Sequence, residues 1–129
     1  MLEFTLYGET PAKKNSRLWL KNGRNIPSAR FRAWHDVAVG TLCKQMAEQC
    51  GVFGISHAVK ITLHFYHGDL RRRDSDNGLS SVLDTLTDAQ ILTDDNWQVV
   101  RKIEVENDYD KGNPRVRIQI EPLNDYKNS

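Results

Sequence analysis

Alternating apolar and polar side chains in separate segments constrain the fold of this chain more than any other feature. Residues 115–121 read RVRIQIE, and residues 2–7 and 58–66 follow the same two-residue period. Successive side chains of a strand point to opposite faces of a sheet, so this period indicates strands with one buried face. Residues 98–106, with Val99, Ile103 and Val105, complete a set of four predicted strands.

Two segments with a helical period separate these strands. Ser28 is the predicted N-cap of a helix that extends to about Gln49. Its apolar stripe is formed by Phe31, Trp34, Ala38, Leu42 and Met46. Ser75 or Asp76 is expected to cap a second helix, which ends near Ala89. The buried stripe of that helix is formed by Leu79, Val82, Leu83 and Leu86.

The order strand, helix, strand, helix, strand, strand predicts an α+β fold. We expect a small two-layer domain in which two helices cover one face of a four-stranded sheet. The sheet is expected to be mixed or mostly antiparallel, with its last two strands paired as a hairpin across the turn NDYDKGNPR. A chain of 129 residues suits a single domain, residues 1–129, with one modest core.

Two further features concern the cellular location. No apolar run approaches the roughly 18 residues that a membrane span requires. The N-terminal residues MLEFTLY have neither the basic region nor the long apolar core of a signal peptide. The sequence therefore predicts a cytoplasmic protein.

Charge is unevenly distributed, although the net charge is only +1. Residues 10–35 carry seven basic side chains and no acidic one, and residues 8–27 are expected to form a basic loop with a short strand at 18–20. Residues 67–97 hold seven aspartates against three arginines. Such a chain can build one surface for polyanions and another for cations.

Asp74 and Asp76 stand two residues apart, where a predicted strand gives way to a predicted helix. In an extended backbone both side chains point the same way, and carboxylates this close repel each other unless a cation lies between them. Mg²⁺ takes oxygen ligands and keeps several waters, so two or three carboxylates suffice to hold it. Asp94 and Asp95 are the candidates for the remaining ligands, which requires the two loops to meet in the folded chain.

Each of these features also has a purely structural explanation. An aspartate at a helix start is a common cap that stabilises a helix by about 1 kcal/mol, and loop aspartates are usually solvated. Three consecutive arginines form a solvated edge more often than a binding site. Their combination with the basic segment favours a phosphodiesterase site, because hydrolysis needs a metal at the reacting oxygens and cations at the flanking phosphates.

The stretch RRRDSDNGLSSVLDTLTDAQILTDDNWQVV, residues 71–100, resembles the RusA family of Holliday junction resolvases (crossover junction endodeoxyribonucleases). In that family a D-x-D-N opens a helix and a D-D follows it. The upstream TPAKKNSRLWLKNGRNIPSARFRAW is similar to the family's basic N-terminal segment. The resemblance covers most of the chain. It implies a RusA-like homodimer that binds four-way DNA junctions and cuts them symmetrically in recombination and repair, using Mg²⁺, for which Mn²⁺ substitutes.

The resemblance also implies roles for individual residues. Asp74, Asp76 and Asp95 match the family's metal-binding, catalytic carboxylates. Asp84 stands where the family often has another helix aspartate, and with Asp94 and Ser80 it is a candidate for a supporting role. The candidates for DNA contacts are Lys13, Lys14, Arg17, Arg71, Arg72 and Arg73.

Two positions depart from the family pattern. The family typically has a lysine where this chain has Ser80, one helical turn beyond Asp76, and a serine supplies no charge to a scissile phosphate. Either another cation replaces that lysine, or this protein binds junctions with weak or no cleavage. Gly78 is expected to loosen the helix start. A less specific nuclease and an interaction domain without a nucleic-acid role are further alternatives.

The remaining candidate motifs are weaker. His64 and His67 form an H-x-x-H without a third ligand at zinc-like spacing. His35 reads as an ordinary helix residue. Trp97 directly follows the acidic loop, and we expect it either to wall the site or to pack beneath it.

Overall fold

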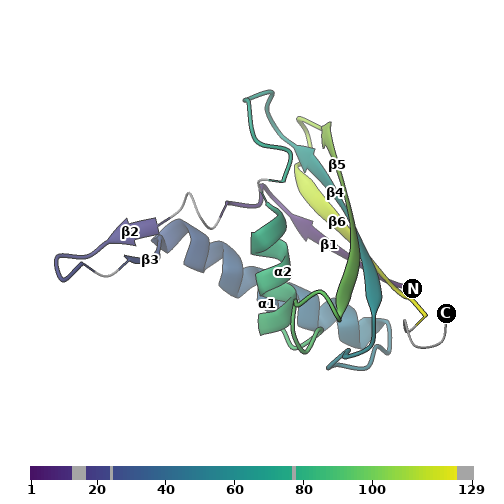
Figure 1. Ribbon diagram of the computed structural model, residues 1–129. Coiled ribbons are helices and arrows are strands. Elements are labelled where there is room, and N and C mark those ends of the chain that lie inside the picture. Colours follow the sequence, from purple (N-terminus) through teal and green to yellow (C-terminus); the bar gives the residue numbers. More distant parts are fainter. Residues whose placement is uncertain (13–16, 24, 77, 125–129) are drawn as a thin grey trace.

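The elements of the fold follow the order expected from the sequence, with one addition. The structure, a computed structural model, describes residues 1–12, 17–23, 25–76 and 78–124. In chain order the elements are β1 (Leu2–Tyr7), β2 (Arg17–Trp19), β3 (Asn25–Pro27), α1 (Ala29–Glu48), β4 (Val59–His67), α2 (Leu79–Asp88), β5 (Val100–Tyr109) and β6 (Arg115–Pro122). The addition is β3, which pairs with β2 in an antiparallel hairpin. This hairpin projects away from the rest of the molecule (Figure 1).

The main sheet is a four-stranded mixed sheet in the order β1-β6-β4-β5. β6 lies between β1 and β4 and is antiparallel to both, whereas β4 and β5 are parallel. The fold class predicted from the sequence is therefore confirmed, but the predicted hairpin of the last two strands is wrong. The short turn after β5 leads β6 past β4, so that β6 is enclosed by two strands and β5 is left at the edge of the sheet (Figure 1).

Both helices cover the same face of this sheet (Figure 1). β4 and β6 each send every second side chain into the core, as the burial of Ile61, Leu63, Val116 and Ile118 shows. The predicted stripe of α1 is confirmed, with Trp34 partly buried and the other four members buried. No helix within the described ranges has the length and apolar character needed to cross a membrane.

The two helices begin in different ways. Ser28 caps α1 as predicted, because its Oγ accepts a hydrogen bond from the backbone N–H of Phe31 at 3.2 Å. The N-cap of α2 is Gly78, without a side-chain cap, so the prediction of Ser75 or Asp76 is wrong. Gly78 is buried against the ring of Phe65, and a Cβ placed on it would lie 2.7 Å from Phe65 Cε1. The glycine therefore lets the helix start approach the sheet closely.

The connection from β4 through α2 to β5 positions the candidate functional residues. Parallel strands need a crossover that returns the chain to the starting end of the sheet. α2 provides this return, so the loop before α2 lies at the end of β4 and the loop after α2 lies at the beginning of β5 (Figure 1). Residues 68–78, the acidic–basic loop, and residues 89–99, the second acidic loop, are thus at opposite ends of α2.

Candidate active site

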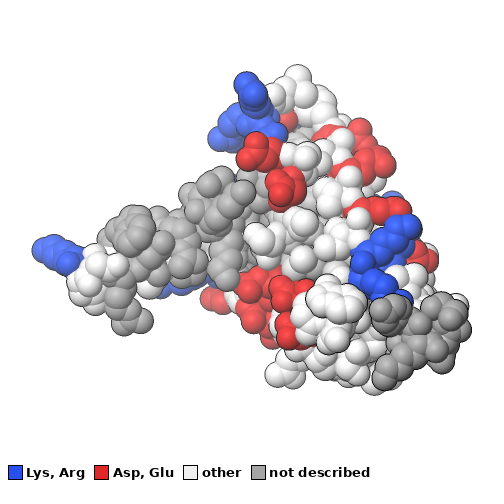
Figure 2. Space-filling view, viewed as in Figure 1, with Lys and Arg blue, Asp and Glu red and all other residues white. Residues whose placement is uncertain are grey.

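Asp74 and Asp76 lie in the acidic–basic loop, and both are exposed. Within the described residues, neither carboxylate accepts a hydrogen bond or forms an ion pair. Arg71 and Arg72, also exposed, immediately precede them. Figure 2 shows this juxtaposition of positive and negative side chains at the tip of the molecule. Two adjacent carboxylates without partners are a suitable donor set for a hard divalent cation.

Asp69 holds the acidic–basic loop in shape. Its carboxylate accepts hydrogen bonds from the backbone N–H of Arg71 at 2.9 Å and from the guanidinium of Arg71 at 3.2 Å, and it pairs with Arg73 at 3.0 Å. The hydrogen bonds from Arg71, together with the positive charge of Arg73, lower the pKa of Asp69 to about 2. Asp69 is therefore a charged hydrogen-bond acceptor that stabilises the conformation of the loop.

The three arginines do not have equivalent surroundings. The side chain of Arg73 is only 17% exposed, and its Nη2 contacts Asp69 and Glu9. The side chain of Arg71 is 76% exposed, and Arg72 is exposed as well. Most of the Arg71 side chain is thus open to a phosphate although its guanidinium also donates to Asp69, and Arg72 is exposed too. Arg73 instead ties the loop to Glu9, just after β1.

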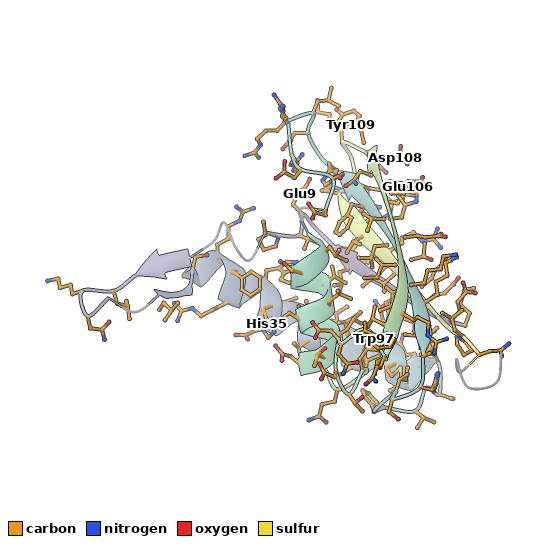
Figure 3. All side chains as sticks on the ribbon, in the orientation of Figure 1. Glu9, His35, Trp97, Glu106, Asp108 and Tyr109 are labelled. Atoms are coloured by element: carbon orange, nitrogen blue, oxygen red, sulfur yellow. The ribbon has the colours of Figure 1, made fainter. Side chains whose placement is uncertain are left out.

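Asp94 and Asp95 lie in the second acidic loop and also differ from each other. The carboxylate of Asp94 accepts hydrogen bonds from Asn96 Nδ2 at 3.1 Å and from the backbone N–H of Asp95 at 2.7 Å, and these bonds lower its pKa. Asp94 is thus engaged in shaping its own turn, while Asp95 is exposed. The side chain of Trp97, in the same loop, is exposed (Figure 3), so of the two alternatives for this residue, packing beneath the loop is wrong.

A single chain does not bring all three predicted ligands together. α2 has ten residues, which corresponds to about 15 Å at 1.5 Å per residue, and it separates Asp74 and Asp76 from Asp95. The expectation that the two loops meet within one chain is therefore wrong, because β5 runs parallel to β4. Among the described residues, no group of metal-ligating side chains combines these aspartates. Their assignment as metal ligands stays a prediction.

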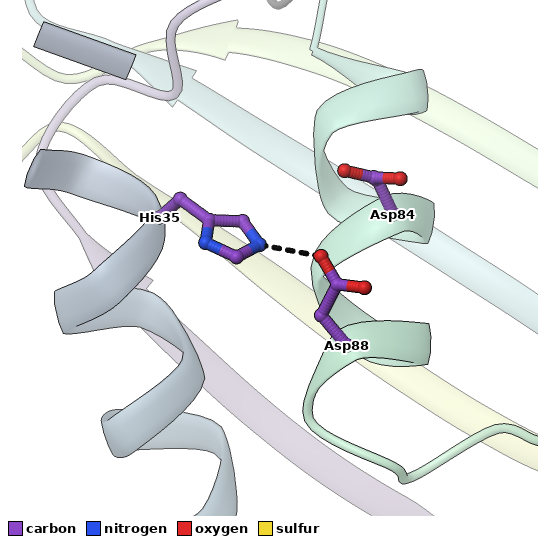
Figure 4. Close-up of side chains that lie close together, drawn as sticks. All are labelled: His35, Asp84 and Asp88. Carbon is purple, nitrogen blue, oxygen red and sulfur yellow. Dashed lines mark hydrogen bonds and ion pairs between the residues drawn. The ribbon is translucent and has the colours of Figure 1, made fainter. Parts of the chain in front are cut away.

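The two supporting candidates on α2 face different surroundings. Ser80 is exposed in the first turn of the helix. Asp84 is partly exposed and lies close to His35 and Asp88 (Figure 4). The possible ligand atoms of these three residues all lie within 4.8 Å of one another, so the three together could hold a metal ion. His35 Nε2 lies 2.7 Å from Asp88 Oδ2 and links α1 to α2. His35 is therefore more than an ordinary helix residue.

A second group of possible metal ligands lies on the face of the sheet away from the helices. It contains His64 of β4 with Glu106 and Asp108 of β5. His64 Nε2 lies 2.6 Å from Asp108 Oδ2 and 3.3 Å from Glu106 Oε2. His67 bonds Glu9 and Asn107 instead, and because His64 and His67 are three residues apart in one strand they point to opposite faces. The H-x-x-H is not a shared site.

The basic segment can be placed only in part. Lys13 and Lys14 lie outside the described residues, and the side chain of Arg17 is not described either. The backbone of residues 17–19 forms β2, which belongs to the projecting hairpin (Figure 1). The segment therefore extends from the same end of the sheet as Glu9, next to the acidic–basic loop.

Sequence reasoning missed a hollow of about 410 Å³ beside the acidic–basic loop. Asp74 and Arg71 line it from the loop, and His67, Asn107 and Tyr109 line it from the ends of β4 and β5. The sequence offered only weak signals for these last three residues, because nothing in an alternating pattern distinguishes a strand end that faces a site from one that faces solvent.

Comparison with known protein families gives the class of protein to which this fold and this site belong. Residues 8–121 match endodeoxyribonuclease RusA, so the class is that of the hydrolases that cut DNA internally. The match spans nearly the whole chain, and the chain belongs to the RusA endodeoxyribonuclease family. A search among individual curated proteins gives no match.

Proposed function

We propose that this protein is a metal-dependent endodeoxyribonuclease that resolves four-way DNA junctions. The observation that carries the proposal is the pair of exposed carboxylates, Asp74 and Asp76, which have no partner among the described residues and lie next to exposed arginines in a chain of this family. The substrate follows from the family, whose resolvases act on branched DNA.

The donor set fits a divalent cation. Asp74, Asp76 and Asp95 offer only oxygen ligands, which suits Mg²⁺ or Mn²⁺ better than a softer metal. A bound cation of this kind makes a water more acidic and stabilises the leaving oxygen of a phosphodiester. The aspartates themselves would orient that water, and Arg71 and Arg72 would hold the flanking phosphates.

Separation of the ligands along α2 implies a dimeric site. Asp74 and Asp76 of one subunit can share an ion with Asp95 only if this residue is Asp95 of the partner subunit. An isologous two-fold contact would lay the two α2 helices antiparallel, so that each acidic–basic loop meets the second acidic loop of the other copy. Acidic side chains lie in several places on the face drawn in Figure 2, as a contact bridged by cations would require. The dimer would carry two equivalent sites, as symmetric cleavage of a junction requires.

Mixing two inactive variants tests both the metal site and its sharing between subunits. Asp76→Asn and Asp95→Asn should each abolish cleavage of a labelled four-way junction in Mg²⁺ while leaving junction binding intact. In a mixed dimer, one composite site contains both substitutions and the other contains neither. The mixture should therefore regain cleavage, limited to one strand of the junction per binding event.

Three outcomes would contradict the proposal in different ways. Full cleavage by Asp76→Asn would contradict the assignment of Asp76 as a metal ligand. Mixed variants that stay inactive, although both subunits exchange, would refute a site shared between Asp76 of one subunit and Asp95 of the other. No cleavage of junctions by the unmodified protein, with tight binding, would favour the alternative of a junction-binding protein. That alternative is supported by the exposed position of Ser80, which offers no cation one turn from Asp76.

Substrate comparison separates this function from that of a less specific nuclease. The protein should cut four-way junctions in preference to flaps, duplexes and single strands of the same sequence. Equal cleavage of all four substrates would leave the metal site intact and refute junction specificity.

A further inference from the structure

A chain of hydrogen bonds links three elements behind Asp74 and Asp76. It begins at Glu9, just after β1, where Oε2 lies 3.2 Å from His67 Nδ1. His67 Nε2 lies 2.8 Å from Asn107 Oδ1, across from β4 to β5. Asn107 Nδ2 then donates to the backbone carbonyl of Ser75 at 2.8 Å. Ser75 is the residue between the two aspartates, so the chain of bonds ends at their shared backbone.

The groups in this series of hydrogen bonds allow only one orientation of the Asn107 amide. A carbonyl can only accept, so the Asn107 amide must present Nδ2 to Ser75, and its Oδ1 therefore faces His67. His67 Nε2 is then a donor. Nδ1 faces the Glu9 carboxylate, which can only accept, so this second bond requires a proton on Nδ1 as well. The ring of His67 is also parallel to that of Phe65, with centroids 6.1 Å apart and 6° between the planes. The histidine is thus fixed by its stacking and by hydrogen bonds at both nitrogens.

Glu9 has the surroundings of a fixed anchor. Its side chain is only 26% exposed. Its Oε1 accepts from the backbone N–H of Gly68 at 2.9 Å and from Arg73 Nη2 at 3.4 Å. Gly68 begins the acidic–basic loop and Arg73 directly precedes Asp74, so one carboxylate holds both sides of the loop. Figure 3 places Glu9 at the base of this loop, near the start of α2.

We infer that Glu9, His67 and Asn107 are positioning residues, which hold the Ser75 carbonyl so that Asp74 and Asp76 face one divalent cation. The inference rests on the proposed function. Mg²⁺ and Mn²⁺ accept only a narrow range of ligand geometries. The aspartates are on an irregular, exposed loop, and at Ser75, between them, its backbone is held from outside the loop by Asn107. Groups that orient metal ligands typically change metal affinity or activity by about 10- to 100-fold when they are removed.

Substitution of Asn107 breaks the last link without disturbing the core. Asn107→Leu keeps the shape of an exposed side chain but cannot donate to Ser75. We expect it to weaken Mn²⁺ binding to the DNA-free protein about tenfold, as measured by calorimetry, and to lower kcat by about 10- to 100-fold. KM and the affinity for a junction in EDTA should change less than about twofold, because the DNA-contacting arginines stay in place. Asn113→Leu makes the same chemical change in an exposed turn and should leave all these values unaltered.

Two variants of His67 separate positioning from mere stability. His67→Phe keeps the stacked ring but removes both hydrogen bonds, whereas His67→Gln keeps a donor that can reach Asn107. Mn²⁺ affinity should therefore fall in the order wild type, His67→Gln, His67→Phe. Equal affinities in this series, or an Asn107→Leu protein that binds Mn²⁺ and cuts DNA normally, would overturn the inference.

The experiments distinguish a failure of the proposed metal site from a failure of the positioning role. If the unmodified protein neither binds Mn²⁺ nor cuts a junction, or if Asp76→Asn binds Mn²⁺ normally, the proposed metal site is wrong and the positioning role falls with it. If the unmodified protein is active and Asp76→Asn is not, the metal site stands. An unchanged Asn107→Leu variant would then refute the positioning role alone.

Discussion

Gly78→Ala should destabilise this protein, because the start of α2 packs against the core with no room for a methyl group at this position. A Cβ at this position would lie 2.7 Å from Phe65 Cε1, 3.0 Å from Phe65 Cζ and 3.2 Å from Thr10 Cγ2. Real Cβ atoms do not approach other heavy atoms to 2.7 Å. The Phe65 ring is 4% exposed in the core and cannot swing aside without displacing its neighbours.

The magnitude follows from two opposing terms. Forcing an extra methyl group into a packed site costs about 1–3 kcal/mol. Replacing glycine by alanine reduces the entropy of the unfolded chain, which stabilises the fold by about 0.4–1 kcal/mol. A contact as short as 2.7 Å with a buried ring places the overpacking cost in the upper half of its range, so the net loss is about 1–2 kcal/mol. With an unfolding entropy of about 2.1 cal/mol/K per residue, a chain of 129 residues should lose about 4–7 °C in Tm.

Thermal and urea unfolding of Gly78→Ala measure this loss, and Gly40→Ala is the matched control. Gly40 lies inside α1, and a Cβ there meets no atom within 4 Å. The control should gain about 0.5–1 kcal/mol. Combining Gly78→Ala with Phe65→Leu, which shortens the ring edge, should give a double variant more stable than the sum of the single effects. A Gly78→Ala protein as stable as the wild type would refute the reasoning.

Three further predictions concern charged residues. Substitution of both Arg71 and Arg72 by alanine should reduce the slope of log affinity against log salt concentration by about 2 for junction binding, because two phosphate contacts are lost. Fluorescence anisotropy measures this slope, and an unchanged slope would show that these arginines do not contact phosphates. Because the pKa of Asp69 falls from 3.8 to about 2 on folding, its carboxylate stabilises the fold above pH 3.8, and this stabilisation is lost as the pH falls towards 2. The Tm of Asp69→Asn should therefore lie below that of the wild type at pH 6 and converge with it near pH 2; a constant difference would contradict this. A double-variant cycle of His35→Ala and Asp88→Ala should give a coupling free energy of unfolding of about 0.5 kcal/mol or more, because these residues link α1 to α2. Strictly additive losses of stability would show that the bond in Figure 4 does not contribute.

Local sequence patterns predicted most of the elements, because helices and half-buried strands are defined by periods within one segment. Ser28 capped α1 as expected, and the alternation in β4 and β6 correctly identified their buried faces. Gly78 shows where such reasoning ends. In the sequence it was a weak helix start, whereas the tertiary structure makes it a contact point with Phe65, 13 positions earlier in the chain.

The sequence by itself determined the two-layer α+β class, the family and the unusual crowding of carboxylates near Asp74 and Asp76. Only the tertiary structure decided which strands are neighbours, and so where Asp95 lies. A two-residue period states which face of a strand is buried, but it is the same for parallel and antiparallel partners. The parallel pairing of β4 with β5 moved Asp95 to the far end of α2, and it also brought Asn107 beside His67 and Ser75. Contacts of this kind depend on strand order and register, which no single segment encodes.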